Sequence, residues 1–245
     1  DGFVMRAGGD ARALVLKDPV FLNDKIFTKA KSKLQILFLD DSIMSQGENS
    51  EMTIDEYVYS PKAKDANRCS VRLAKGLFRV LTGKITALNP ERFKVRTRMA
   101  TIGIRGCDLG FKVTEASEDV YIIQLHGQES VTVTARPGVG LGEWTGLVDE
   151  RWDDTDVAKR HLINVLKSNR IISITQSTGL NQRELSPDEL ISLINGVTPQ
   201  LPDSPNNTPP ATAPYTHYAT SRAARTTETT PPARPLSPLR DPRIP

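Results

Sequence analysis

Few residues of this chain have the types and spacing that catalysis requires. Cys107 and His126 could supply a thiol and a base, but neither lies in a nucleophile motif and no third residue is evident to orient the histidine. The three histidines, at positions 126, 161 and 217, include no two with metal-ligand spacing. The sequence therefore favours a protein that is not an enzyme and that uses no metal or cofactor.

Two short segments resemble ligand-binding loops but lack their essential parts. The acidic run at 153–156 has neither the glycine nor the distant glutamate of a calcium loop, so we interpret it as the start of a helix. The glycine-rich segment at 138–142 has no apolar helix directly after it, which a phosphate-binding loop requires. We expect a simple loop or a bend of the chain there.

Trp144 and Trp152 are the residues best suited to contact a partner. A large amphipathic ring can either close the end of a β-structure or anchor a binding surface. Both alternatives remain open from the sequence.

Composition excludes some classes of function. The 245 residues carry a formal charge of +3, and Lys and Arg alternate with acids, so nothing indicates nucleic-acid binding. The longest apolar run, Leu34–Leu39, is far too short to span a bilayer. Because the chain begins at Asp1, we expect a processed or trimmed product that is periplasmic or secreted. In that location Cys69 and Cys107 either form a disulfide or remain two separate buried thiols.

Short alternating segments separated by turn residues dominate residues 1–150 and predict an all-β domain. The most informative stretch is Phe93–Val113, where two alternating runs flank Gly103, Arg105 and Gly106. Glycines there indicate that the backbone bends, bulges or approaches another backbone. Because Arg105 has apolar neighbours, we expect it to be a buried structural residue that carbonyls or a carboxylate hold in place.

This stretch resembles the hallmark of the FecR-domain family, sensor modules named after the iron-dicitrate transducer. The family pattern is a strand ending in Thr, a small residue, an apolar pair and then Arg-Gly-Thr with an acidic or polar residue. Cys107 stands where threonine is usual, which leaves the role of that hydroxyl unassigned. The hallmark positions are Thr97, Ala100, Gly103, Arg105, Gly106, Cys107 and Asp108.

The resemblance extends over most of residues 1–150. Asp40-Asp41-Ser42 is similar to a family turn that usually reads Asp-Gly-Ser, and Asp41 can replace glycine because Asp tolerates a left-handed conformation. The resemblance implies a twisted β-solenoid or roll of short strands. Alternation alone would also allow a sandwich or a barrel.

Beyond the β-domain we expect a helix–strand–helix extension over residues 151–197. Apolar residues on one face and charges suited to the helix dipole predict the first helix at Val157–Lys167. Residues 171–175 suggest a strand. Ser186, Pro187 and Glu189 form the signature of a capping box, so a second helix should begin there and end at Asn195–Gly196.

Residues 198–245 lack core-forming side chains. Twelve of the 17 prolines follow Val197, and threonine and alanine fill much of the remainder. Such a segment buries too little apolar surface to offset its ordering entropy, so we predict a disordered tail that serves as a spacer or contacts an anionic wall polymer.

The resemblance also implies a function. FecR-like domains in transmembrane regulators pass a signal from an outer-membrane receptor to a cytoplasmic sigma factor. We therefore expect a non-enzymatic sensing module that binds a protein partner, an envelope or receptor protein, through its β-scaffold. The alternative is a structural protein of the cell envelope with the tail as its spacer.

Overall fold

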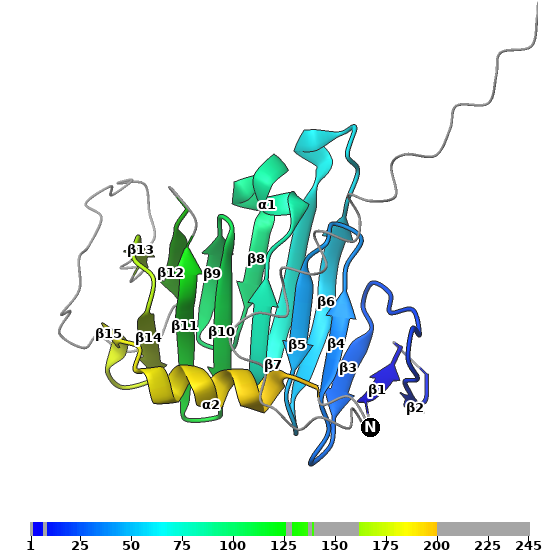
Figure 1. The fold of residues 1–245 in the computed structure, drawn as a ribbon, viewed down its shortest axis with the longest axis horizontal. Helices are drawn as coiled ribbons and strands as arrows, with labels where there is room; N and C mark the ends of the chain where they lie inside the picture. The colour runs from blue at the N-terminus through cyan, green and yellow to red at the C-terminus, as the bar shows by residue number, and fades with distance from the viewer. Residues whose placement is uncertain (1, 7–8, 126–128, 137–138, 140–161, 200–245) are drawn as a thin grey trace, which may run out of the picture. The chain divides into compact units, whose positions relative to one another are not determined.

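The computed structural model describes residues 2–6, 9–125, 129–136, 139 and 162–199 (Figure 1). Residues 1–200 form one compact unit. Trp144, Trp152 and nearly all of the expected tail lie outside the described residues, as does the expected domain boundary near residue 150.

One long strand, β7 (Arg68–Leu81), organises two layers of strands. Its first half pairs with β6 (Glu51–Val58) and, in parallel, with β8 (Phe93–Arg96). Its second half pairs with β5 (Ile43–Gln46) and β10 (Cys107–Val113). Since both layers contain part of β7, their strands form one continuous, open sheet.

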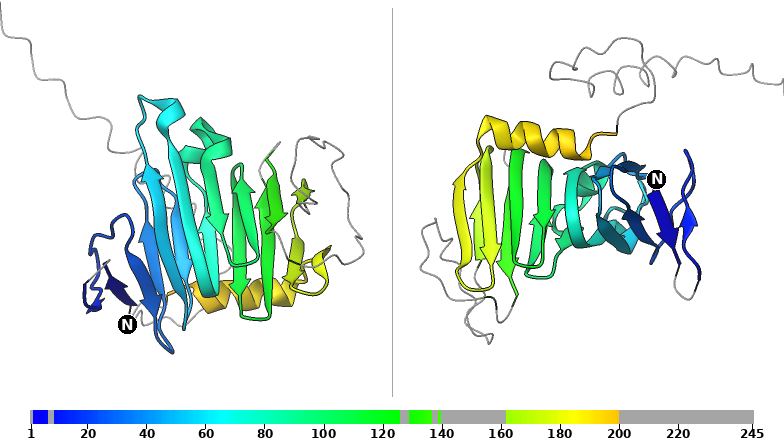
Figure 2. Two further views of the ribbon diagram at one scale, coloured as in Figure 1. Left: turned by 180° about the vertical axis from the view of Figure 1, so that it is seen from behind. Right: turned by 90° about the horizontal axis from the view of Figure 1, so that it is seen from below.

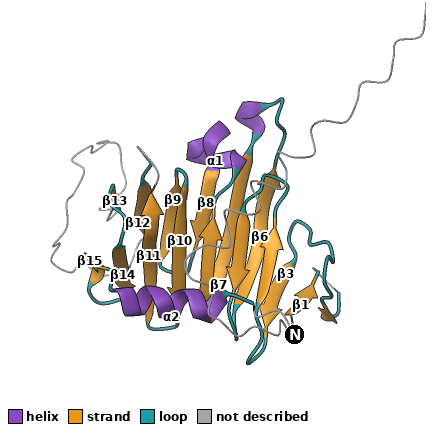
Figure 3. Ribbon diagram, in the orientation of Figure 1, coloured by secondary structure: helices purple, strands orange, loops and turns teal. Residues whose placement is uncertain are grey.

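The remaining strands extend each layer outward from β7. The first layer has the order β2 (Arg12–Ala13), β1 (Gly2–Met5), β3 (Lys25–Thr28), β6, β7, β8, β9 (Ala100–Ile104), β12 (Val131–Ala135) and β13 (Leu162–Val165). The second layer has the order β4 (Leu34–Leu37), β5, β7, β10, β11 (Ser117–Leu125), β14 (Arg170–Thr175) and β15 (Gly179–Glu184). The helices are η1 (Lys64–Ala66), α1 (Lys84–Leu88), η2 (Pro90–Arg92) and α2 (Pro187–Val197) (Figure 3).

The core lies between the two layers because alternate residues of each strand are apolar. In β8, Phe93 and Val95 are buried, whereas Lys94 and Arg96 are exposed. Buried side chains of both layers form a single hydrophobic cluster. This confirms the mainly β class. The solenoid is not confirmed: every strand pair within the described residues is antiparallel except β7–β8.

Gly76 lies where β7 passes from the first layer to the second. Its φ of +114° belongs to a region that side-chain-bearing residues rarely adopt, and a Cβ atom there would overlap Ser50. The Ser50 hydroxyl accepts a hydrogen bond of 3.0 Å from the Leu77 amide, directly after this bend. Glycine at this position therefore allows β7 to pair with strands of both layers.

Helix α2 lies across the outer face of the second layer (Figure 2). Leu193 of this helix forms a second hydrophobic cluster with Tyr121, Ile171 and Leu185. A Cβ atom at Gly110 of β10 would overlap Leu193, so this glycine permits the close approach of the helix. The capping box at Ser186 and Glu189 is present, which confirms the predicted start of α2.

The helix predicted at Val157–Lys167 is wrong for its described part. Residues 162–165 form β13, which pairs antiparallel with β12. Ile163 and Val165 are buried at alternate positions, so the strand period determines their structure rather than the helical one. Moreover, β14 pairs with β11, so these strands complete the two layers instead of forming a separate extension.

Replacement of Gly76 by alanine should destabilise the protein by about 2–4 kcal/mol, because it combines backbone strain with overlap against Ser50. Urea unfolding followed by circular dichroism measures this change. Gly103→Ala is the matched control, since a Cβ atom there lies no closer than 3.9 Å to the neighbours it meets. Equal stability of the two variants would contradict the role of Gly76.

Candidate functional site

The hallmark corner carries the chain from the first layer to the second. Arg105 and Gly106 lie between β9 and β10, and Gly106 has a φ of +90°. The Arg105 side chain is 48% exposed and forms an ion pair with the exposed Glu91. A carboxylate does hold Arg105, but the expectation that Arg105 is buried is wrong. Its apolar sequence neighbour Ile104 points into the core, whereas Arg105 starts the turn and points outward.

The buried ion pair of this region joins Asp108 to Arg79 of β7. Two parallel hydrogen bonds connect them: Arg79 Nε lies 2.9 Å from Asp108 Oδ1, and Nη2 lies 2.6 Å from Oδ2. The side chains are only 12% and 8% exposed. Asp108 is one of the hallmark positions expected from the sequence, whereas Arg79 was not predicted as a site residue. An arginine flanked by apolar residues within a predicted strand was the available signal.

Thr97 and Ala100 close the turn between β8 and β9. The Thr97 hydroxyl accepts a hydrogen bond of 3.0 Å from the Ala100 amide and donates toward the Glu118 carboxyl. Glu118 lies on β11, in the opposite layer, and also accepts a hydrogen bond of 3.0 Å from the Met99 amide. Burial raises the pKa of Glu118, although these hydrogen bonds oppose the rise.

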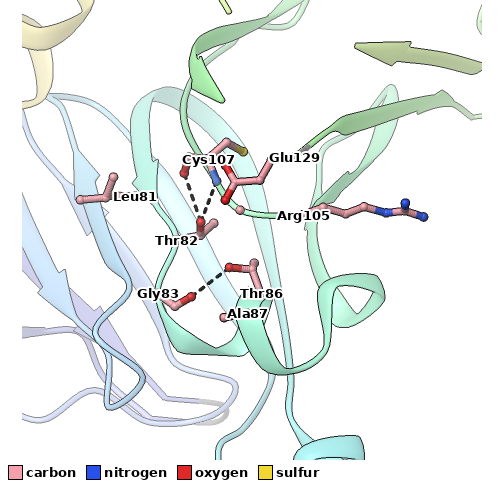
Figure 4. Close-up of a pocket in the computed structure, with 9 residues that line it drawn as sticks. Leu81, Thr82, Gly83, Thr86, Ala87, Arg105, Cys107 and Glu129 are labelled. Carbon is pink, nitrogen blue, oxygen red and sulfur yellow. Dashed lines mark hydrogen bonds between the residues drawn. The ribbon is translucent and has the colours of Figure 1, made fainter. Parts of the chain in front are cut away.

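Cys107 borders a cavity of about 160 Å³ at the same corner (Figure 4). Its amide donates to the Thr82 hydroxyl at 2.8 Å, and that hydroxyl lies 3.2 Å from the Cys107 carbonyl. Burial raises the pKa of the thiol, and the charges of Glu129 and Asp108 raise it further. A thiol held neutral in this way is a poor nucleophile. Cys69 and Cys107 are two separate buried free cysteines.

The Asp40–Ser42 turn fixes the hairpin between β4 and β5. Asp41 has a φ of +66°, which confirms that Asp occupies a left-handed position here. Asp40 is fully buried and accepts hydrogen bonds from the Ser42 hydroxyl at 2.7 Å and the Tyr57 hydroxyl at 3.0 Å. It also accepts from the Ile85 amide at the start of α1. The hairpin that carries β4 is therefore rigidly attached to the core.

Strand β4 presents an apolar edge. Leu37 is 69% exposed and Leu39, two residues after the end of the strand, is 79% exposed. Phe38 donates its amide to Ser42, so Phe38, Ile36 and Leu34 direct their backbone groups toward β5. Gln35 and Leu37 consequently direct theirs away from β5, where no described strand pairs with them. We call Leu34–Leu39 the β4 edge.

The hallmark corner lies within a segment of the chain that matches a known protein family. The family model described as FecR protein matches residues 24–128. These residues form a FecR domain. The match begins before β3 and ends after β11, and it includes the hallmark corner and the β4 edge.

Structural comparison finds two crystal structures of a candidate anti-sigma factor from Parabacteroides distasonis ATCC 8503, at 1.65 and 2.50 Å resolution. Each is 14% identical with a TM-score of 0.47 and covers 70% of this chain. The match spans 65% and 64% of the length of those chains. No curated protein matches the chain in sequence.

The other edges around the FecR domain suit strand pairing less well. The β15 edge carries Arg183 and Glu184, which form ion pairs with Glu189 and Arg170, and β2 has only two residues. Charged or very short edge strands oppose pairing with another chain. β13 directly follows undescribed residues. The β4 edge is therefore the apolar edge that the described structure leaves open.

The described residues contain no group of three or more His, Cys, Asp or Glu side chains placed to hold a metal ion. None of their helices has the length and apolar character needed to cross a membrane.

Asp108→Ala should destabilise the FecR domain by about 3 kcal/mol, because it removes the carboxylate from the buried guanidinium of Arg79. Arg105→Ala should cost less than about 1 kcal/mol, since its ion pair with Glu91 is exposed. Thermal and urea unfolding of both variants test the comparison. A larger loss in Arg105→Ala would show that the hallmark arginine is the structural residue after all.

Glu118 should make stability fall as pH rises. Its folded pKa lies above its ordinary value of 4.5, so the folded protein binds more protons than the unfolded chain between these two values. The loss begins near the ordinary value and is complete above the raised one. Unfolding free energies of Glu118→Gln across this range should lack that contribution. The exposed Glu115→Gln serves as control, and the same pH profile in Glu118→Gln and the parent would refute the assignment.

Proposed function

We propose that this chain is a non-enzymatic regulatory module that binds an extended segment of a partner protein at the β4 edge. The observation that carries the proposal is an unpaired apolar edge strand within the FecR domain. The FecR family match supports a role in signal sensing. A periplasmic or secreted location is part of the same proposal.

Strand addition uses the backbone for affinity and side chains for specificity. An added strand would hydrogen-bond to the outward backbone groups of Gln35 and Leu37. On the outer face it would meet an apolar row that crosses three strands, formed by Leu37, Ile43 and Leu81, which lie opposite one another in register. Side chains of the partner on either side of the added strand would pack against this apolar row.

Charge near the start of β4 indicates the chemistry of the partner segment. Lys29, Lys31 and Lys33 precede the strand. Lys29 lies over the Phe3 ring and Lys33 donates to the Asn195 carbonyl at the end of α2, whereas the side chain of Lys31 is exposed. An acidic residue of the partner beside Lys31 would steer and orient it. The partner segment should therefore be extended, apolar at alternate positions and acidic at one end.

The direct test measures binding of fluorescein-labelled nonapeptides that alternate valine and threonine and end in two glutamates. Fluorescence polarisation should show saturable binding to the full chain. Leu37→Pro should weaken it at least about tenfold, because proline removes the outward amide but leaves the hydrogen bonds to β5 intact. The same peptide ending in two lysines should also bind more weakly.

Gln182→Pro is the matched control for Leu37→Pro. Its amide faces outward on the β15 edge, since Leu185 donates to Asn169 and neighbouring positions of β15 alternate. This variant should bind the acidic peptide like the parent. Unchanged binding in Leu37→Pro, with circular dichroism showing both variants folded, would overturn the proposed site.

A further inference from the structure

A second cavity lies on the outer face of the first layer, away from both the β4 edge and the hallmark corner. It has a volume of about 360 Å³ and is bordered by residues of β6, β7 and β8, which lie side by side (Figure 1). Its polar lining consists of Asp55, Glu56 and Tyr57 from β6, Arg68 and Ser70 from β7, and Arg96 from β8.

Ser70 is the unusual member of this set. Its side chain is on the outward side of β7, in register with Glu56 on one neighbouring strand and Lys94 on the other. The residue is nevertheless only 4% exposed, and its hydroxyl has no hydrogen-bond partner among the described residues. A buried hydroxyl without a partner costs free energy, so such groups are rare unless something else bonds to them.

One arginine that lines the cavity has no ion-pair partner among the described residues. Arg72 pairs with Asp55 at 3.1 Å, and Arg68 pairs with Glu56. Arg96 lies directly beside Arg72 in the parallel register of β7 and β8. Within the described part of the chain, Arg96 has no carboxylate partner and no hydrogen-bond acceptor. One guanidinium is thus available next to the unpartnered hydroxyl.

We propose that this cavity binds a carboxylate group, with the Arg96 guanidinium and the Ser70 hydroxyl as its donors. Guanidinium nitrogens match the two oxygens of a carboxylate, and a hydroxyl adds a third hydrogen bond. Among the charged residues that line the cavity, Arg96 alone has no ion-pair partner in the described part of the chain, so a single negative charge suits it. A phosphate dianion suits it less well, because Asp55 and Glu56 line the same cavity. The carboxylate belongs either to a small organic acid or to the C-terminus of a peptide.

Nuclear magnetic resonance titration of the full chain tests this site. Sodium acetate, added at constant ionic strength against sodium chloride, should shift the Ser70 amide and Arg96 Nε signals to saturation. Arg96→Gln should weaken binding at least about tenfold, and Ser70→Ala by about three- to tenfold. Arg12→Gln is the matched control, because Arg12 is an exposed arginine on β2, distant from the cavity in the strand order.

A short peptide with a free C-terminus, compared with its amide, separates the two sources of the carboxylate. Tighter binding of the free peptide than of acetate assigns the site to a chain terminus, and equal binding assigns it to a small acid. Saturation by phosphate but not acetate, no saturation by either, or equal acetate affinity in Arg96→Gln and the parent would overturn the proposal.

Stability gives an independent measurement for Ser70. If its hydroxyl serves a ligand, Ser70→Ala should unfold at the same denaturant concentration as the parent, or a higher one, without acetate present. Acetate should then raise the midpoint of the parent by more than that of the variant, in proportion to the weaker binding of the variant. A lower midpoint for Ser70→Ala without acetate would show that the hydroxyl has a structural role and would refute the site.

Discussion

The continuity of β7 is the constraint on which the described fold depends. A single strand supplies pairing partners to β6 and β8 in one layer and to β5 and β10 in the other, so neither layer can shift without the other. Side-chain alternation must then keep apolar residues inside on both sides of the bend, and Gly76 provides the backbone conformation that makes this geometry accessible. The hallmark corner follows from the same constraint. Since β8 and β10 lie in different layers, the chain must cross between them, and it does so at Arg105 and Gly106.

The two outer faces of the layers have different characters. Helix α2 covers much of the second layer, and the Arg79–Asp108 pair is buried on that layer beyond the apolar cluster. What remains uncovered is the apolar row that ends at Leu37. The outer face of the first layer is instead charged, and its ion pairs surround Ser70. The proposed peptide edge and the proposed carboxylate site therefore lie on opposite layers, where each can be altered without changing the contacts of the other.

Local rules predicted what depends on a few neighbouring residues. The left-handed Asp41, the capping box at Ser186 and the many short strands were all accessible from sequence. Long-range pairing was not. Residues 162–165 satisfy both a helical and an alternating pattern, and the presence of β12 beside them decides between the two. Arg105 and Arg79 show the same limit for the site. Both have apolar neighbours in sequence, but only Arg79 lies on a strand that meets a facing carboxylate in a buried position.

The strands beyond the family match belong to the same compact unit as the matched residues. Residues 24–128 end after β11, yet β14 pairs along β11, and the helix that follows covers Tyr121 and Gly110. A fragment with the family boundaries would leave β11, with its buried Val120 and Ile122, as an unprotected border of the sheet. A stable fragment of this protein should therefore extend through Val197, and such a fragment is longer than the residues that the family model matches.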